Sequence, residues 1–157
     1  MERPKVGIGV CVKRGNKVLL HKRKNAHGEG DWCFPGGHLE WKESWEECAI
    51  RETKEESGLD IKNVRFGAVT NDIFEKENKH YITLIMVADY IDGEAERKEP
   101  YKCEKWDWFE WDKLPELLFV PMQNLLKQHF NPFKFENDYY DATRFDEQES
   151  ENKSSAE

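Results

Sequence analysis

Several features that restrict a protein's class are missing from this 157-residue sequence. Its four cysteines form no CxxC pair and follow no regular spacing, so a disulfide framework is not indicated. No apolar run approaches the roughly 18 residues that a membrane-spanning helix needs, and the first residues have no signal-peptide pattern. There is no internal repeat. We therefore expect a cytoplasmic protein, without a membrane partner, whose cysteines are small buried apolar side chains.

The sequence also lacks the clustered positive charge of a protein that binds duplex nucleic acid. Its net charge is −8, and residues 136–157 contain eight acidic residues against Arg144 and Lys153. Six of the eight negative units therefore lie in this terminal region, and the remainder of the chain is nearly neutral. A polyanionic substrate would need a metal ion and a few well-placed cations. We expect one folded domain over residues 1–135, followed by an acidic, disordered tail over residues 136–157.

One stretch, residues 36–59, combines a pair of glycines with a strongly predicted helix. Ser44 and Glu47 have the spacing of a capping box, in which each residue satisfies a free backbone N–H of the other at the start of a helix. Good helix formers fill the residues that follow, and Gly58 supplies a left-handed C-terminal stop. The glycine pair just before the helix permits close approach of the backbone to a ligand or metal.

Three glutamates share one face of this predicted helix. At about 3.6 residues per turn, Glu52, Glu55 and Glu56 are neighbours, and on a solvated helix their repulsion costs a few tenths of a kcal/mol per pair. A hard divalent cation would compensate this repulsion, and carboxylate oxygens suit Mg²⁺, with Mn²⁺ as an alternative. Arg51 is positioned to orient the acidic cluster through a charge-assisted pair. The pattern indicates metal-assisted attack on a phosphate chain, in which Glu55 or a glutamate from another loop receives the proton of the attacking water.

The same stretch resembles the Nudix box, GX5EX7REUXEEXGU, in which U is a bulky aliphatic residue. Gly37, Glu43 and the run from Arg51 to Leu59 match the pattern in register, and Thr53 is the one departure, at a usually aliphatic position. We expect Thr53 to pack through its methyl group. Residues 5–133 are similar to the MutT-type nucleoside triphosphate pyrophosphohydrolases, including animal enzymes for thiopurine and oxidised guanine triphosphates and plant dihydroneopterin-triphosphatase relatives.

This resemblance implies a fold, a reaction and a set of site residues. The fold is α/β (α+β), with a mixed β-sheet sandwiched between helices, and the reaction is attack of water within a triphosphate, giving a nucleoside monophosphate and pyrophosphate. The implied metal ligands are Glu52, Glu55, Glu56 and the carbonyl of Gly37. The implied catalytic residues are Arg51, Glu55, Glu56 and Glu104. The implied substrate-binding residues are Arg23, Gly36, Gly37, His38, Leu39, Leu118 and Phe119.

Some of these assignments have a simpler structural alternative. The sequence is also consistent with Glu104 as an ordinary glutamate of a surface loop. Arg23 is likewise consistent with a solvated cationic face, and His38 with a partly exposed histidine of a loop. Residues 117–119 correspond to a loop that sandwiches the base in the relatives, but Val120 replaces a tryptophan found there. The replacement removes a stacking surface that contributes on the order of 1–3 kcal/mol, and it leaves the base preference open.

Alternation and turn residues predict the remaining elements. Gly7 and Gly9 interrupt the first β-branched strand, and we interpret them as small residues on a crowded sheet face rather than as a dinucleotide-binding loop. Trp106 and Trp108 share one face of a later strand and are expected to pack in the core. The predicted elements are a hairpin over residues 6–20, a short strand at 32–34, a long hairpin formed by 64–74 and 80–91, a strand at 105–111, a helix start at 112–115 and a helix at 121–130.

The leading hypothesis is a Mg²⁺-dependent enzyme that cleaves modified or oxidised nucleoside triphosphates such as 8-oxo-dGTP and so cleans the nucleotide pool. A second hypothesis keeps this chemistry but changes the substrate to dihydroneopterin triphosphate, a dinucleoside polyphosphate or a nucleotide sugar. A third is a catalytically silent Nudix-like module that binds a nucleotide or a protein partner. We also expect a homodimer formed through sheet and loop surfaces, for which the long apolar hairpin is a candidate.

Overall fold

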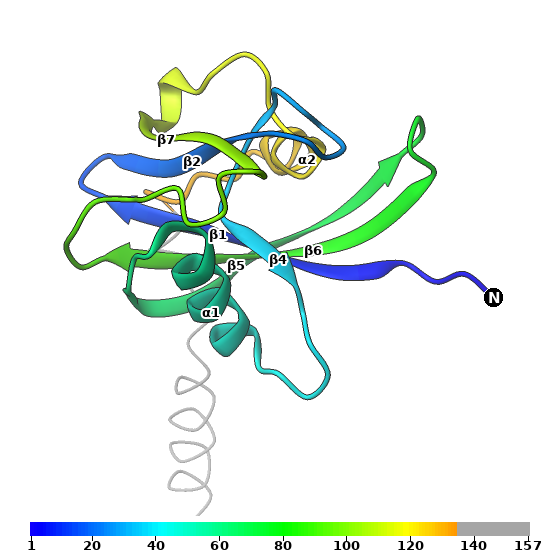
Figure 1. The fold of residues 1–157 in the computed structure, drawn as a ribbon, viewed down its shortest axis with the longest axis horizontal. Helices are drawn as coiled ribbons and strands as arrows, with labels where there is room; N and C mark the ends of the chain where they lie inside the picture. The colour runs from blue at the N-terminus through cyan, green and yellow to red at the C-terminus, as the bar shows by residue number, and fades with distance from the viewer. Residues whose placement is uncertain (135–157) are drawn as a thin grey trace, which may run out of the picture.

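A mixed β-sheet lies between two helices in the computed structural model, which describes residues 1–134 (Figure 1). The tail predicted over residues 136–157 lies outside the described residues. The elements in chain order are β1 (Lys5–Arg14), β2 (Lys17–Arg23), β3 (Trp32–Cys33), β4 (Gly36–His38), α1 (Trp45–Ser57), β5 (Ile61–Phe74), β6 (Lys79–Tyr90), β7 (Cys103–Glu110), the 3₁₀ turn η1 (Trp111–Lys113) and α2 (Val120–Lys127). Both predicted hairpins are present.

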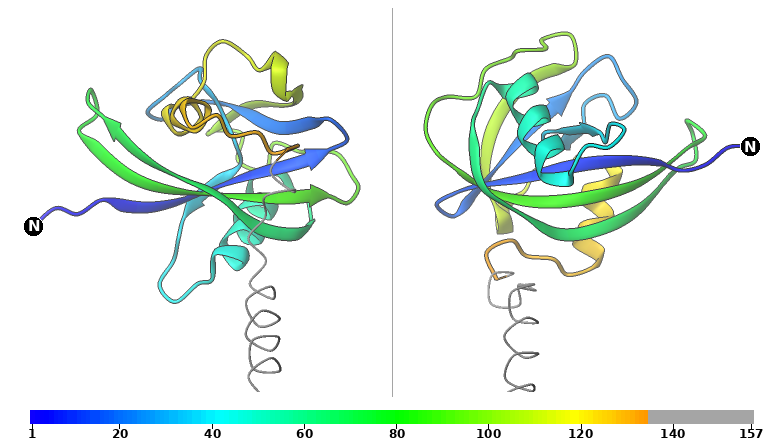
Figure 2. Two further views of the ribbon diagram at one scale, coloured as in Figure 1. Left: turned by 180° about the vertical axis from the view of Figure 1, so that it is seen from behind. Right: turned by 90° about the horizontal axis from the view of Figure 1, so that it is seen from below.

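The sheet divides into two parts around β1. β1 pairs in parallel with β6 from Lys5 to Lys13, its first half pairs on the other side with β4, and β6 pairs with β5. β1 and β2 share only two register pairs next to their turn, Lys13 with Val18 and Arg14 with Lys17. β2 pairs along its whole length with β7, and beyond the two β1 pairs its other edge pairs with β3. The two parts of the sheet therefore diverge from the first hairpin, as the further views in Figure 2 show.

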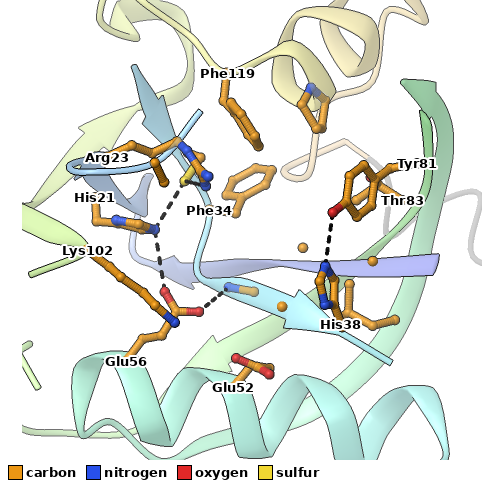
Figure 3. A pocket seen from close by; sticks show the side chains of 18 of the residues that line it. His21, Arg23, Phe34, His38, Glu52, Glu56, Tyr81, Thr83, Lys102 and Phe119 are labelled. Atoms are coloured by element: carbon orange, nitrogen blue, oxygen red, sulfur yellow. Dashed lines mark hydrogen bonds and ion pairs between the residues drawn. The ribbon is translucent and has the colours of Figure 1, made fainter. Parts of the chain in front are cut away.

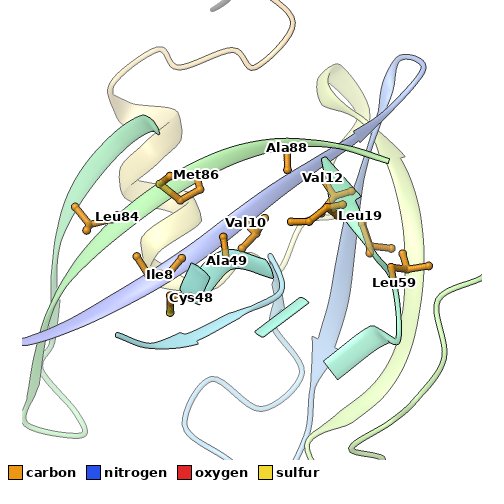
Figure 4. Close-up of a cluster of buried hydrophobic side chains, with 11 residues drawn as sticks. Ile8, Val10, Val12, Leu19, Cys48, Ala49, Leu59, Leu84, Met86 and Ala88 are labelled. Carbon is orange, nitrogen blue, oxygen red and sulfur yellow. The ribbon is translucent and has the colours of Figure 1, made fainter. Parts of the chain in front are cut away.

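Two apolar cores cover opposite faces of the sheet. In the first core, side chains at even positions of β1 and β6, such as Val10 and Met86, pack with Cys48 and Ala49 of α1 (Figure 4). In the second core, side chains at odd positions such as Ile85 pack with residues of α2. Each buried aliphatic side chain of this size contributes roughly 1.5–3 kcal/mol relative to its exposure to water. The alternation of β1 and β6 therefore fixes which helix lies on which face.

The ends of α1 confirm the capping prediction. The Ser44 hydroxyl accepts a hydrogen bond from the N–H of Glu47 at 3.1 Å, and the Glu47 carboxylate accepts one from the N–H of Ser44 at 3.2 Å. Gly58 has the predicted left-handed conformation, with φ of 77°, and its N–H donates to the carbonyl of Lys54. Thr53 is completely buried, and its hydroxyl has no hydrogen-bond partner among the described residues. This hydroxyl lies where the box pattern has an aliphatic side chain.

Other boundaries differ from the predictions. The helix predicted to start at residue 112 is only the single turn η1, because Pro115 disfavours helical backbone at Leu114, which is extended (φ −67°, ψ 153°). The second helix starts at Val120, with a proline in its first turn, and ends at Lys127. The strand predicted over residues 64–74 begins three residues earlier, at Ile61.

The predicted interior residues are buried or partly buried. All four cysteines are free and buried, and Trp106 and Trp108 pack against the first core. Gly9 lies on a crowded sheet face as expected, since a Cβ atom there would lie 3.1 Å from the side chain of Ile85. Within residues 1–134, no helix is long and apolar enough to cross a lipid bilayer.

Candidate active site

A cavity of about 710 Å³ lies where the two parts of the sheet diverge. Residues of β1, β2, β4, β5, β6 and α1 line it, together with loop residues that precede β3 and β7 and the start of α2. Figure 3 shows Glu52 and Glu56 projecting from α1 toward the cavity, with Phe119 and Tyr81 across from them. The cavity thus has a carboxylate end and an aromatic end.

Arg51 connects the acidic side chains at the carboxylate end. Its Nε and Nη2 donate to the two oxygens of Glu43 at 2.7 and 2.9 Å, and its Nη1 donates to Glu52 at 2.7 Å and to Glu55 at 3.4 Å. The hydrogen bonds from Arg51 lower the pKa of Glu43 to about 2. Nη2 also donates to the carbonyl of His38 at 3.2 Å. Arg51 therefore ties α1 to the backbone at the end of β4.

Glu56 is enclosed by groups from two other elements. Its Oε1 accepts a hydrogen bond from the N–H of Gly36 at 3.0 Å, and its Oε2 lies 3.5 Å from Nε2 of His21. The same His21 nitrogen lies 3.1 Å from the sulfur of Cys33. Burial raises the pKa of Glu56 to about 8 and lowers that of His21 to about 3. At neutral pH the His21 imidazole is therefore uncharged, and the metal-free Glu56 carboxyl holds its proton more tightly than an exposed glutamate.

The two glycines of β4 allow the backbone to approach α1 and β1. A Cβ atom on Gly37 would lie 2.3 Å from the carboxylate carbon of Glu52, and one on Gly36 would lie 2.0 Å from the carbonyl oxygen of Ile8. Neither position accepts a side chain without displacing its neighbours. The glycine pair is thus required for the backbone of β4 to lie against the carboxylates.

The groups around Gly37 fit a hard divalent cation by their donor chemistry. Glu52, Glu55 and Glu56 of α1 and the backbone carbonyl of Gly37 offer only oxygen ligands, which Mg²⁺ prefers. Among residues 1–134, no three His, Cys, Asp or Glu side chains are already arranged to hold a metal. The reason is visible in the contacts, since Arg51 binds Glu52 while Gly36 binds Glu56. Metal binding would require the carboxylates to exchange these partners for the cation.

Four rings form an aromatic chamber at the other end of the cavity: His27, Phe74, Tyr81 and Phe119. The ring of His27 lies 4.8 Å from that of Phe74 and 5.3 Å from that of Phe119. Burial, followed by the nearby charge of Arg23, lowers the pKa of His27 to about 4, so this ring is uncharged at neutral pH. The neutral rings of the chamber are therefore suited to stack against a planar heteroaromatic ring of a ligand.

Polar groups at the edge of the aromatic chamber come from Arg23 and His38. Nε of Arg23 donates to the carbonyl of His27 at 2.9 Å, and its guanidinium carbon lies 3.9 Å from the centre of the Phe119 ring. Nε2 of His38 lies 3.2 Å from the hydroxyl of Tyr81. Arg23 thus lies between the aromatic chamber and the carboxylate end, where a phosphate chain would run.

The cavity brings together most of the site residues that the sequence indicated. They are Arg23, Gly36, Gly37, His38, Arg51, Glu52, Glu55, Glu56 and Phe119. Three others do not line it. Glu104 forms an ion pair with Lys22 at 3.5 Å and is half exposed, Leu39 packs against the first core, and Leu118 is buried in the second core.

Sequence reasoning missed several lining residues. Glu99, Tyr101 and Lys102 come from the charged loop before β7, in which no motif distinguishes them from solvated residues. His21 was also missed, although a histidine inside an apolar strand is a signal that could have been used. Gly7 lines the cavity as well, and two glycines in a strand interior often mark close approach of a ligand.

Comparison with protein families matches residues 3–130 to the NUDIX domain. The chain belongs to the Nudix family. It is therefore a Nudix hydrolase that acts on phosphoanhydrides, and enzymes of this family typically depend on a divalent metal. The match includes the box helix, the glycine pair and the loops that build the cavity.

Two groups of sequence relatives carry different names. An ADP-ribose pyrophosphatase of Methanocaldococcus jannaschii is 34% identical over 116 residues, which are 74% of this chain and 68% of the relative. An NAD-capped RNA hydrolase, NudC, of Edwardsiella ictaluri is 34% identical over 110 residues, which are 70% of this chain. The match spans only 40% of the length of that relative.

Solved structures confirm the predicted α/β fold. A MutT Nudix hydrolase from Burkholderia pseudomallei matches with a TM-score of 0.75 and 33% identity, over 81% of this chain and 98% of that one. A MutT protein from Methanosarcina mazei Go1 matches with a TM-score of 0.67 and 23% identity, over 88% and 99% of the two chains. The second likeness concerns the fold alone.

Proposed function

We propose that this Nudix hydrolase is a Mg²⁺-dependent pyrophosphohydrolase of nucleoside triphosphates. The observation that carries the proposal is the order of groups along the cavity, which runs from the aromatic chamber through Arg23 to the α1 glutamates and Lys102. A base stacked in the chamber directs its phosphates past Arg23 toward the glutamates. Lys102 then places a positive charge beside the terminal phosphates. This charge favours a triphosphate, whose leaving group is charged, over a substrate whose leaving group is uncharged.

The α1 glutamates and the carbonyl of Gly37 would hold the metal, which when bound neutralises phosphate charge and polarises the attacking water. Glu55 is the general base in this proposal. Its side chain is 54% exposed and its contact with Arg51 is long, at 3.4 Å, so its carboxylate is available for a proton. The water oxygen bonds to phosphorus, the phosphoanhydride bond breaks and releases pyrophosphate, and the water proton passes to Glu55.

Arg51 positions this base rather than the substrate. Its strongest bonds are to Glu43 and Glu52, and its bond to Glu55 limits the directions in which that carboxylate can turn. Modified purine triphosphates such as 8-oxo-dGTP are the first class to test, because the aromatic chamber is built for stacking and purines stack over a large area.

A second candidate substrate is ADP-ribose or a related dinucleotide. Tyr101 favours it, because this ring lines the cavity from the Lys102 side and is 58% exposed. A second ring or ribose on the far side of the cleaved bond would find a stacking surface there. The name of the Methanocaldococcus relative points to the same substrate.

A substrate panel with product analysis tests the proposal. The full chain is incubated with Mg²⁺ and dGTP, 8-oxo-dGTP, dATP, ADP-ribose or NAD, and the products are separated by anion-exchange chromatography. We expect conversion of triphosphates to the monophosphate and pyrophosphate, with kcat/KM at least tenfold above that for ADP-ribose. Faster cleavage of ADP-ribose would replace the proposal with the second candidate, and no cleavage of any triphosphate would overturn it.

A further inference from the structure

One buried carboxylate near the aromatic chamber has no part in the proposed reaction. It belongs to Asp72 of β5, which is completely shielded from solvent and does not line the cavity. Its neighbours on the same face of β5 are Thr70 and Phe74, and Phe74 is one of the rings of the aromatic chamber. Burial of a carboxylate is costly unless hydrogen bonds satisfy its oxygens. The partners of Asp72 therefore indicate what this carboxylate does.

Three side chains donate hydrogen bonds to Asp72. Its Oδ2 accepts from the hydroxyl of Thr70 at 2.9 Å and from the hydroxyl of Thr83 at 2.5 Å. Its Oδ1 accepts from Nδ2 of Asn124 in α2 at 2.9 Å. The same Nδ2 donates to the backbone carbonyl of Asn71 at 3.2 Å, and because a carbonyl only accepts, this end of the amide is the NH₂ group. All three partners are thus donors, as a deprotonated carboxylate requires.

Of these three partners, only Thr83 lines the cavity. Thr83 follows Tyr81 by two residues in β6, so both side chains are on the same face of the strand (Figure 3). Gly7 is directly opposite Thr83 in the β1–β6 pair, and even a Cβ atom on Gly7 would lie 3.8 Å from Oγ1 of Thr83. The absence of a side chain at Gly7 leaves room beside this hydroxyl for a ligand.

The bond to Asp72 decides which kind of hydrogen bond Thr83 offers a ligand. A hydroxyl has one proton and two lone pairs, and the proton of Thr83 is used on Asp72. The oxygen therefore accepts a hydrogen bond from an N–H group but cannot donate one to a carbonyl or a ring nitrogen. Purine bases differ in this respect, since an exocyclic amino group or the N7–H of an 8-oxopurine donates, whereas O6 or an unmodified N7 accepts.

We propose that Asp72 determines base specificity through Thr83. By holding the Thr83 proton, Asp72 makes this wall of the cavity an acceptor, which selects purine bases that present an N–H donor to it. The proposal rests on the proposed function, because it requires a base in the aromatic chamber. Asp72 is a positioning residue, since it acts through Thr83 and does not touch the substrate. A base with an acceptor at this point would face the Thr83 oxygen with no proton between them, which should weaken binding about tenfold or more.

Asp72→Asn reverses this hydrogen bond with little change in the size of the side chain. The NH₂ group of Asn124 still requires an acceptor at the Oδ1 position, so the new side chain places its carbonyl oxygen there and its own NH₂ group at the Oδ2 position. This NH₂ group then donates to the hydroxyls of Thr70 and Thr83. The Thr83 proton is released toward the cavity, and Thr83 can donate as well as accept. Selectivity for a donor on the base should therefore be lost.

Matched pairs of nucleotides that differ by one N–H donor test the proposal. The pairs are dGTP with dITP, which lacks the 2-amino group, dATP with purine deoxyriboside triphosphate, which lacks the 6-amino group, and 8-oxo-dGTP with dGTP, whose N7 carries no hydrogen. The donor ratio is kcat/KM for the nucleotide with the donor divided by that for its partner, measured on the full chain with Mg²⁺. We expect a donor ratio of about ten or more for at least one pair in the wild type, and a ratio near one for that pair in Asp72→Asn.

The donor ratio compares two substrates on the same protein, so a general loss of stability does not change it. Thr83→Val removes the hydroxyl and should abolish the same ratio. Asp72→Asn added to Thr83→Val should change the ratio no further, because Asp72 acts through the Thr83 hydroxyl. Thr70→Val is the matched control, since it removes the other hydroxyl on Oδ2 of Asp72 from a residue that does not line the cavity. This control should keep the wild-type ratio.

Three results would overturn the proposal. They are a wild type without donor preference in any pair, a wild-type ratio retained in Asp72→Asn or in Thr83→Val, and a ratio lost as completely in Thr70→Val as in Asp72→Asn. Failure of the proposed function is recognised separately, as no cleavage of any triphosphate. The same pairs are then compared as monophosphates by their Kd in isothermal titration calorimetry. A donor preference that Asp72→Asn abolishes would still support the role of Asp72, and no preference would overturn it.

Discussion

The guanidinium of Arg51 and the carboxylate of Glu43 are joined by two hydrogen bonds, of 2.7 and 2.9 Å. Glu43 lies before α1 and Arg51 lies two turns into it, so this pair fixes the glycine-containing loop to the helix. It also leaves Nη1 of Arg51 free to bind Glu52 and Glu55. The position of Glu52 and Glu55 therefore depends on a residue that precedes the helix.

The first prediction concerns acid stability. Hydrogen bonding to Arg51 lowers the folded-state pKa of Glu43 to about 2, below the value of an unfolded glutamate. The resulting stabilisation is fully present above the unfolded pKa and is lost as the pH falls toward 2. Glu43→Gln should lower the free energy of unfolding at pH 7 by about 1–3 kcal/mol and flatten its dependence on pH below 5. Urea unfolding at a series of pH values measures both effects, and a variant with the wild-type acid profile would contradict this role for Glu43.

The second prediction concerns the departure from the box pattern. The buried Thr53 hydroxyl has no partner among the described residues, so Thr53→Val removes an unsatisfied polar group and should raise the free energy of unfolding by about 1 kcal/mol. Thr70→Val is the matched control, because Thr70 is equally buried but its hydroxyl donates to Asp72 at 2.9 Å. This control should be destabilised. Equilibrium unfolding decides between them, and a loss of stability in Thr53→Val would mean that its hydroxyl is satisfied.

The third prediction concerns the base. Phe119→Ala removes a ring of the aromatic chamber and should raise KM for the preferred nucleotide about tenfold or more, since stacking contributes on the order of 1–3 kcal/mol per base. Leu117→Ala is the control, because Leu117 is 62% exposed and does not line the cavity. Steady-state kinetics of the two variants should separate them clearly. Equal effects would show that the base binds elsewhere.

The fourth prediction distinguishes two acidic residues outside the box. Glu99 lines the cavity and lies 3.5 Å from Lys102, whereas Glu104 is paired with Lys22 outside it. Glu99→Gln should therefore lower kcat/KM about tenfold more than Glu104→Gln, because only Glu99 is a charged group inside the cavity, beside Lys102. Activity lost only in Glu104→Gln would restore the assignment that the family resemblance implies.

Local patterns in the sequence were sufficient to predict the box helix and its ends. Ser44, Glu47 and Gly58 act on neighbouring backbone groups, so their effect does not depend on the rest of the fold. The long hairpin was predicted from an apolar run of strand type and the polar turn before it, which are also local features. The pairing of β2 with β7, by contrast, joins residues about 90 positions apart, and no local pattern encodes it.

Dependence on residues far apart in the sequence also explains why the predictions for Glu104 and Leu118 differ from the structure. A shift of register in the β2–β7 ladder lies between Cys103 and Lys105, where Glu104 stands, and such irregularities depend on both strands. Leu118 is held by a bridge to Trp32, which directs it into the core while the adjacent Phe119 lines the cavity. The direction of a loop side chain depends on packing against distant residues. Composition and spacing could identify the loop but not the side chain that faces the substrate.

Binding of Mn²⁺, followed by electron paramagnetic resonance in place of the silent Mg²⁺, most directly tests whether the α1 glutamates hold the catalytic metal. The wild type is compared with Glu52→Gln, Glu55→Gln and Glu56→Gln, and with Glu46→Gln as a control on the same helix but outside the cavity. We predict that Glu52→Gln and Glu56→Gln weaken binding at least tenfold and that Glu46→Gln leaves it unchanged. Unchanged binding in all three cavity variants would contradict the proposed metal site.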